Sequence, residues 1–446
     1  MSYKYKFLKS GCKLITIPRS ESRTTHIAFF VKVGSRDEVE GEFGMAHFLE
    51  HMLFKGNRSL KTQLRITNNL DKMGSDYNAY TTKNTTCYHI SVASKYATRA
   101  FKTYSNMLLH STLKQKEMRK EQRVVVEEFN KMIDNVIRYS IENVFQLIFK
   151  GTDLGRPTIG YVDSILGLTH TSLNRFYRKY YKKNNMLIVV SGKIPKELLS
   201  KIYGIYGRPT NKKTTTITKT PKLEPGIHLP IDYGLPRPLK IKVYNCPREC
   251  NMICLDQRKE VKQSNIIIAY RIPGLYDTDN FKLEVLSEYL GGGMSSILFQ
   301  KIRTRLGLAY TIRTEMELYE EGGVFMIYAG TDKKNTETVV SKILEEVDKL
   351  QKVLLEKRVV KECLDKITGR FIMAEENGMN LCLSYGSRAL FDAKIYDNKR
   401  LTKEFTLQRM KPWMIRDTAK KYLNRENLYV SILGDHPLNI TRTILK

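Results

Sequence analysis

A stretch near the middle of the chain has no secondary-structure periodicity, and it separates the parts of the sequence that can form a core. Residues 207–239 are rich in Thr, Lys and Pro, and they show neither the alternation of a strand nor the repeat of a helix. A chain of 446 residues exceeds one ordinary core, and a usual size of about 100–200 residues allows two to four domains. Because the stretch divides the chain into nearly equal halves, we predict domains at 1–208 and 240–446 with a linker at 209–239.

The two halves share a pattern of apolar runs. The first half has a β-like run at 26–33, and the second opens comparably at 265–270. Each half closes on another β-like run that ends in glycine, at 186–192 and 428–434, and each contains long amphipathic helical patterns. The correspondence suggests an internal duplication of an α+β unit.

The composition is that of a folded protein with a large excess of positive charge. Hydrophobic residues make up 41% and aromatic residues 10%, which argues against a largely disordered chain. Lys and Arg number 75 against 46 Asp and Glu, and the net charge of +29 is spread along the chain. Such a field attracts acidic peptides, nucleic acid or anionic lipid, or it reflects only a Lys-rich proteome. Nucleic-acid binding is the weaker hypothesis, since the sequence has no zinc-finger spacing, Arg-rich arm or RNP-like aromatic segment.

Targeting signals are not visible in the sequence. The first residues lead directly into a β-like run at 13–17, without an apolar signal-peptide core or an Arg- and Ser-rich leader. No apolar run reaches the roughly 18–20 residues of a transmembrane helix. Seven scattered cysteines, an odd number, favour reduced thiols over a disulfide framework. We therefore expect a cytoplasmic or otherwise intracellular protein that does not enter a membrane.

The clearest chemical motif lies between Gly44 and Phe54, where His47, Glu50 and His51 form the pattern H-x-x-E-H. On a helix, positions i, i+3 and i+4 share one face, so both imidazoles and the carboxylate would point the same way. Neutral imidazole nitrogens are good Zn²⁺ ligands, and a carboxylate beside a zinc-bound water can take its proton. We predict that the two histidines are metal ligands and that Glu50 is the general base. The alternative is a chance match of the pattern.

A catalytic zinc site needs a further ligand, because it usually keeps three protein ligands and one open position. A helical segment around residue 125 supplies three carboxylates, Glu121, Glu127 and Glu128. Glu121 and Glu128 are nearly two turns apart and share a face, whereas Glu127 is rotated from it by about 100°. We therefore predict Glu128 as the ligand and Glu121 as a carboxylate that orients a ligating histidine. An ordinary solvated helix face is the alternative for each of them.

Further segments have the composition and order of a family signature: Gly34–Glu38, Gly44–His47, Phe54–Gly56, Asn78–Thr81, Leu154–Gly160, Gly291–Ser296 and Gly307–Tyr310. In addition, 76 residues separate His51 from Glu128. Together these features resemble the M16 family of inverted-zincin metallopeptidases, which includes pitrilysin, insulin-degrading enzyme and the mitochondrial processing peptidase. The resemblance extends over almost the whole chain.

The resemblance implies an α+β fold of two homologous halves, each a mostly antiparallel sheet flanked by helices. It also implies one zinc ion per chain and endopeptidase cleavage of extended peptides or unfolded polypeptides in an enclosed chamber. The strand at Asn78, Ala79 and Tyr80 is expected to pair with the substrate backbone. Arg303 and Tyr310 are expected to hold the substrate backbone and the developing oxyanion.

The length of the chain is similar to that of the processing-peptidase-like subfamily, in which two chains close into one chamber. Because this chain carries both the zinc motif and the Arg303–Tyr310 pair, a homodimer is favoured, and a heterodimer with a related subunit is the alternative. The alternative to an enzyme is a non-catalytic partner subunit. Two departures limit the resemblance: Asn84 stands where relatives often have an acidic residue, and the positive charge is unlike an acidic chamber for basic presequences.

Overall fold

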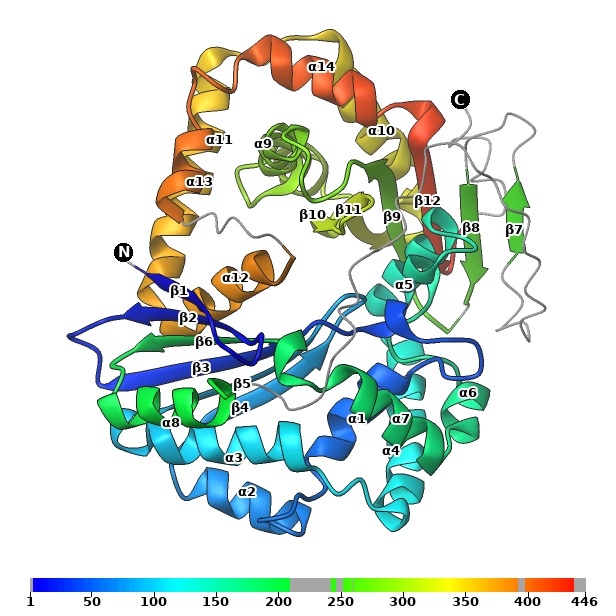
Figure 1. Ribbon diagram of the computed structural model, residues 1–446. Helices are drawn as coiled ribbons and strands as arrows, with labels where there is room; N and C mark the ends of the chain where they lie inside the picture. Colours follow the sequence, from blue (N-terminus) through cyan, green and yellow to red (C-terminus); the bar gives the residue numbers. More distant parts are fainter. Residues whose placement is uncertain (1–2, 209–241, 246–251, 259, 392–397, 437–446) are drawn as a thin grey trace. The chain divides into compact units, whose positions relative to one another are not determined.

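The computed structural model describes residues 3–208, 242–245, 252–258, 260–391 and 398–436. The linker predicted at 209–239 therefore lies outside the described residues. The described part forms two six-stranded sheets, each within its own compact unit. Figure 1 shows both sheets with helices packed against them.

The first sheet is built entirely from the first half of the chain. In spatial order it contains β1 (Lys4–Phe7), β2 (Lys13–Pro18), β6 (Met186–Gly192), β3 (Thr24–Val31), β5 (Thr86–Ala93) and β4 (Asp76–Thr81). The pair β2–β6 is parallel and the other neighbours are antiparallel. Among the described strands, β4 has a partner on one side only, so its outer edge is open.

Helices cover both faces of the first sheet, which is why its central strands are apolar on both sides. On one face α3 (Ala97–His110) packs against β3 and β5, and the ring of Phe29 stacks on Phe101 at a centroid distance of 5.7 Å. The next residue, Phe30, points to the opposite face because side chains alternate along a strand. There it joins a buried cluster with Tyr385 of α12 (Gly378–Phe391).

The second sheet has the same topology as the first. Its spatial order is β7 (Lys242–Asn245), β8 (Met252–Gln257), β12 (Leu428–Gly434), β9 (Gln263–Ile272), β11 (Gly323–Asp332) and β10 (Ala309–Leu318). In each half the order is first, second, sixth, third, fifth and fourth strand, and only the second and sixth strands run parallel. This match is structural support for the duplicated α+β unit.

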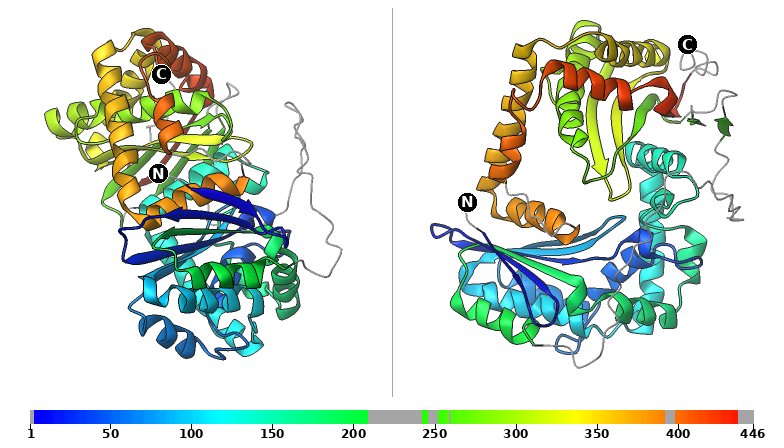
Figure 2. Two further views of the ribbon diagram at one scale, coloured as in Figure 1. Left: turned by 60° about the vertical axis from the view of Figure 1, so that its left-hand side comes forward. Right: turned by 45° about the horizontal axis from the view of Figure 1, so that its top comes forward.

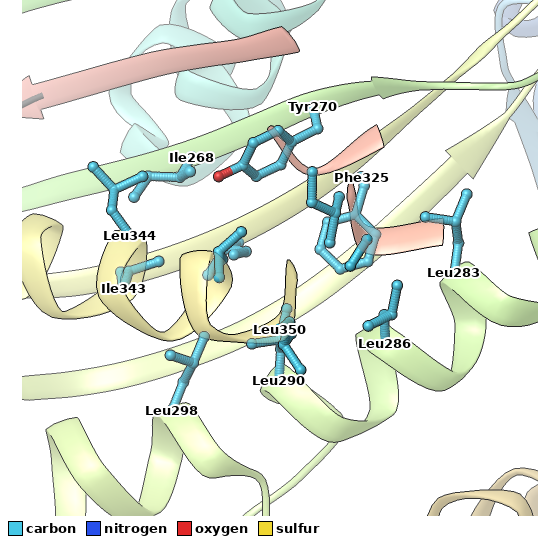
Figure 3. Packing of buried hydrophobic residues seen from close by; sticks show 14 of the residues in the cluster. Ile268, Tyr270, Leu283, Leu286, Leu290, Leu298, Phe325, Ile343, Leu344 and Leu350 are labelled. Carbon is cyan, nitrogen blue, oxygen red and sulfur yellow. The ribbon is translucent and has the colours of Figure 1, made fainter. Parts of the chain in front are cut away.

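Two layers of helix also enclose the second sheet. Its larger core lies beneath α9 (Asp279–Gly291), α10 (Thr336–Lys352) and α14 (Pro412–Tyr422). Figure 3 shows Ile268, Tyr270 and Phe325 of the strands facing leucines and isoleucines of α9 and α10. On the opposite face, Ile267 and Ala269 pack against α5 (Val136–Ile148).

Each compact unit takes one covering helix from the other half of the sequence. The first unit comprises residues 1–129, 156–236 and 374–396, and it includes α12; the second comprises the remaining residues and includes α5. Both views in Figure 2 show α12, in orange, along a face of the first sheet. The units are therefore discontinuous in sequence, although each sheet stays within one predicted domain. The domain limits at 1–208 and 240–446 stay a prediction.

No helix in the described ranges is long and apolar enough to cross a membrane. The cysteines of the described residues are buried free thiols, namely Cys12, Cys87, Cys254, Cys363 and Cys382.

Candidate metal centre

The H-x-x-E-H motif lies on α1 (Met45–Leu53), a short helix of the first unit. Gly44 precedes it with φ of +91°, a left-handed conformation that favours glycine. The buried Glu38 carboxylate accepts hydrogen bonds of 2.8 Å from the backbone N–H groups of Gly44 and Ala46. Because the first N–H groups of a helix have no partner within it, Glu38 fixes the start of α1.

The two other predicted carboxylates lie on α4 (Gln115–Asp134). Glu121 is buried with 4% of its surface exposed, and it follows the inward spacing of Met118 and Val125. Glu128 lies two turns further along the same face, whereas Glu127 is exposed. The helical rotation of about 100° between these adjacent residues therefore leaves Glu128 on the face of Glu121 and turns Glu127 to solvent.

Three side chains from α1 and α4 converge on one point. One ligand atom each from His47, His51 and Glu128 lies within 4.8 Å of the others. Glu128 Oε2 is 3.7 Å from His47 Nε2 and 3.4 Å from His51 Nε2. Two ligands of a tetrahedral ion that are each about 2.0–2.1 Å from it stand about 3.3–3.4 Å apart. The spacing and the donor types thus fit zinc.

The hydrogen bonds of His51 also favour a cation at this point. Its Nδ1 lies 2.9 Å from Glu121 Oε1, so the neutral ring carries its proton there and directs the Nε2 lone pair toward Glu128. A lone pair and a carboxylate oxygen 3.4 Å apart repel each other unless a proton or a cation lies between them. Burial alone lowers the pKa of His51, but hydrogen bonds with Glu121 and Glu128 outweigh it and raise the pKa to about 9.

Glu50 lies on the same helix beside these groups and is 8% exposed. Thr81 Oγ1 of β4 donates a 2.6 Å hydrogen bond to Glu50 Oε2. Burial raises the pKa of the Glu50 carboxyl above its usual range, while Thr81 and His51 act in the opposite direction. A buried carboxylate with a raised pKa is suited to exchange protons near neutral pH.

Lys55 completes the surroundings of Glu121. Its Nζ lies 2.5 Å from Glu121 Oε2 and also donates to Gln63 Oε1 at 3.2 Å. Burial acts to raise the pKa of Glu121, but His51 and Lys55 outweigh it and hold the pKa below its usual range. Lys55 and Thr81 lie in two of the signature segments, Phe54–Gly56 and Asn78–Thr81, but the sequence predicts no individual role for either. Lys55 lies in the turn that follows α1, two residues beyond Leu53, so helical periodicity gave no signal for its contact with Glu121.

The predicted substrate strand is β4, the edge strand described above. Asn78 is exposed, while Ala79 and Tyr80 are half-buried. The Asn78 side chain accepts a 2.8 Å hydrogen bond from the Ala79 N–H, and Tyr80 packs on the cluster beneath α12. Asn84, in the turn after β4, accepts a hydrogen bond of 3.1 Å from Arg36 Nη1, so here this position helps to hold the turn.

Arg303 and Tyr310 belong to the second unit. Arg303 lies on a π-helical turn (Phe299–Arg305) with its guanidinium 4.7 Å from the ring centre of Phe299. Tyr310, near the start of β10, is exposed, and its hydroxyl donates to Asp332 Oδ1 at 3.0 Å. Their roles toward a substrate stay a prediction.

Comparisons with known proteins show the family of the chain. Residues 13–161 match the family described as insulinase (peptidase family M16), and residues 167–363 match the peptidase M16 inactive domain. The chain belongs to peptidase family M16. An uncharacterized zinc protease of Bacillus subtilis is similar to this M16 protein, with 27% identity over 373 residues and 83% of each chain covered. Another, from Streptomyces coelicolor, is 29% identical over 344 residues, which cover 76% of this chain and 70% of the relative.

Solved structures share the fold. A protease from Helicobacter pylori superimposes with a TM-score of 0.82 at 20% identity, covering 97% of this chain and 99% of that one. A peptidase M16 inactive domain from Pseudomonas fluorescens gives a TM-score of 0.80 at 15% identity, covering 98% and 99%. The predicted α+β fold, with two sheets flanked by helices, is thereby confirmed, as is the predicted family.

Proposed function

We propose that this M16 protein is a zinc-dependent endopeptidase that cleaves extended peptides or unfolded polypeptides and holds one zinc ion per chain. The observation that carries the proposal is the convergence of His47, His51 and Glu128 beside the buried carboxylate of Glu50. The names of the Bacillus and Streptomyces relatives, both called zinc proteases, support the same metal.

Three residues of the site would hold a metal ion, and a fourth would transfer a proton. Zinc held by His47, His51 and Glu128 would supply Lewis acidity to the scissile carbonyl and to a water molecule. Glu50 then takes a proton from the water through its other oxygen, Oε1, and passes it to the nitrogen of the leaving amine. Glu121 would keep His51 in the tautomer whose Nε2 is available as a metal ligand.

The open edge of β4 is the place where an extended peptide would bind. Backbone hydrogen bonds to Asn78, Ala79 and Tyr80 would add the peptide to the first sheet as a further strand, which gives affinity with little sequence preference. Arg303 and Tyr310 would hold the substrate backbone and the developing oxyanion, a donor role typically worth about 3 kcal/mol. A second copy of this chain, or a related subunit, would complete the enclosed chamber.

A non-catalytic partner subunit is the second candidate, because residues 167–363 match a domain described as inactive and a structural neighbour carries the same description. The two candidates differ in the first unit: a non-catalytic subunit has no use for a complete set of three ligands and an adjacent buried base. This chain has all four groups.

The test combines metal analysis with cleavage of an unstructured, quenched-fluorescence peptide. We expect about one zinc per chain and a cleavage activity that a chelator removes. Glu50→Gln should keep the zinc and lose activity by at least about a thousandfold, since general-base catalysis and correct placement of the water both depend on it. Glu128→Gln should lose the zinc, while Glu127→Gln, a matched change at the exposed neighbour, should behave as the wild type. Undiminished cleavage by Glu50→Gln would exclude the assigned base.

A further inference from the structure

We propose that Thr81 is a positioning residue that aims the carboxylate of Glu50 and links it to the strand expected to bind the peptide. The inference rests on the proposed function, because it takes Glu50 as the general base. It adds a residue to which the H-x-x-E-H motif assigns no role, on a different element and 31 residues after the base in the sequence.

The contact between the two side chains is short and largely shielded from water. Thr81 Oγ1 lies 2.6 Å from Glu50 Oε2, within the range of about 2.5–2.7 Å for a hydroxyl bound to an ionised carboxylate. Glu50 is 8% exposed, so water contributes little to its orientation. With Oε2 held, rotation about the last side-chain bond is restricted, and Oε1 is left for the reacting water.

The register between β4 and β5 places the Thr81 hydroxyl on the face of the sheet where Glu50 lies. Thr81 pairs with Thr86 of β5, and side chains alternate between the two faces along β4. Tyr80 packs on the cluster beneath α12, so Thr81 points to the opposite face, against which α1 lies. A shift of one residue would turn the hydroxyl away from Glu50.

The backbone at Thr81 is held in place by the loop before α1. The carbonyl of Thr82 accepts a hydrogen bond of 3.2 Å from the N–H of Ser35, and the carbonyl of Lys83 accepts one of 3.0 Å from the N–H of Arg36. Thr81 is therefore the fixed member of the pair, and the Glu50 carboxylate, which ends a side chain with three rotatable bonds, is the member that is oriented.

The link to the substrate follows from the position of Thr81 at the end of β4. The same strand carries Asn78, Ala79 and Tyr80, whose open edge is the expected site of the peptide. A peptide that pairs with this edge would lie along the strand whose last residue, Thr81, holds the base. Removal of the hydroxyl should therefore lower the rate of the chemical step and leave peptide binding largely intact.

The test compares Thr81→Val and Thr81→Ala, which lack the hydroxyl, with Thr81→Ser, which keeps it. Thr86→Val is the matched control, because this buried threonine lies directly across the ladder and donates to the Val33 carbonyl at 2.9 Å rather than to Glu50. We expect the zinc-loaded Val and Ala variants to lose about 10- to 100-fold in kcat, with KM and zinc content within about twofold of wild type. The Ser and Thr86→Val proteins should stay within about threefold of the wild-type kcat.

Two kinetic results would overturn the proposal: wild-type kcat in both variants without the hydroxyl, or a Ser variant as impaired as they are. Two variants without the hydroxyl guard against the failure of one to fold. A crystal structure of Thr81→Val or Thr81→Ala gives a readout that needs no activity, since the Glu50 carboxylate should rotate away from its wild-type position. An unmoved carboxylate would refute the proposal. If the wild type shows no Glu50-dependent cleavage, the proposed function fails, and the crystal structure still decides the role of Thr81.

Discussion

Replacement of Glu121 by Gln tests how the metal centre is built, because it removes a charge without removing a ligand. Glu121 binds His51 Nδ1 at 2.9 Å through one oxygen and Lys55 Nζ at 2.5 Å through the other. Gln keeps one acceptor, but it cannot serve both donors, and it leaves the ammonium of Lys55 without its counter-charge beside the metal site. Both effects should weaken zinc binding.

The electrostatics of His51 set an upper limit on the loss of zinc affinity. Its surroundings raise the pKa from 6.5 to about 9, which corresponds to about 3 kcal/mol in favour of positive charge on this ring. Glu121 and Glu128 share this effect. Residues that orient a metal-ligating histidine usually contribute about 10- to 100-fold to metal affinity, so we expect a rise of that size in the zinc dissociation constant. This corresponds to about 1.4–2.7 kcal/mol and stays within the 3 kcal/mol.

The assay is competition for zinc between the metal-stripped protein and a chromophoric chelator at pH 7, with circular dichroism to show that the fold is kept. Glu127→Gln is the matched control, since it makes the same change on the same helix at an exposed position. Glu121 has no such role if Glu121→Gln binds zinc within twofold of the wild type, or if the control is weakened equally.

Three further predictions concern stability. In chelator-treated protein the stabilisation from His51, whose pKa rises from 6.5 to about 9 on folding, is complete below pH 6.5 and lost as the pH approaches 9, so the melting temperature should fall across that interval. Gly386→Ala would bring a Cβ onto the ring of Phe30 in β3, so the free energy of unfolding in denaturant titrations should fall by about 1–3 kcal/mol. Gly369→Ala, on a helix with open space around it, should raise that free energy by up to about 1 kcal/mol. Glu38→Gln breaks one of two hydrogen bonds at the start of α1 and should cost about 1–3 kcal/mol, with the exposed Glu40→Gln unchanged.

Local geometry explains why much of the site could be predicted from the sequence. The spacing of His47, Glu50 and His51 places them on one helical face, and the seven-residue spacing on α4 selects Glu128 over Glu127. Both inferences need only the period of a helix. The duplicated sheets were foreseeable for a similar reason, because each half carries the same order of apolar runs.

Long-range packing could not be predicted from the local periodicity of the sequence. The amphipathic stripes of α5 and α12 predict that each helix covers a sheet, but a stripe does not specify which sheet, and each covers the one built from the other half. The contact of Thr81 with Glu50 depends on the strand register, and that of Lys55 with Glu121 depends on how α1 meets α4. Neither register nor helix contact is encoded in local periodicity.

We propose that side chains from α1 and α4 together bind one divalent metal ion. Anomalous scattering from a crystal of the zinc-loaded protein, recorded on both sides of the zinc absorption edge, would detect this ion. We expect one strong peak about 2.0–2.1 Å from the Nε2 atoms of His47 and His51 and from a carboxylate oxygen of Glu128. A peak elsewhere, or a Glu128 side chain turned away from both imidazoles, would contradict it.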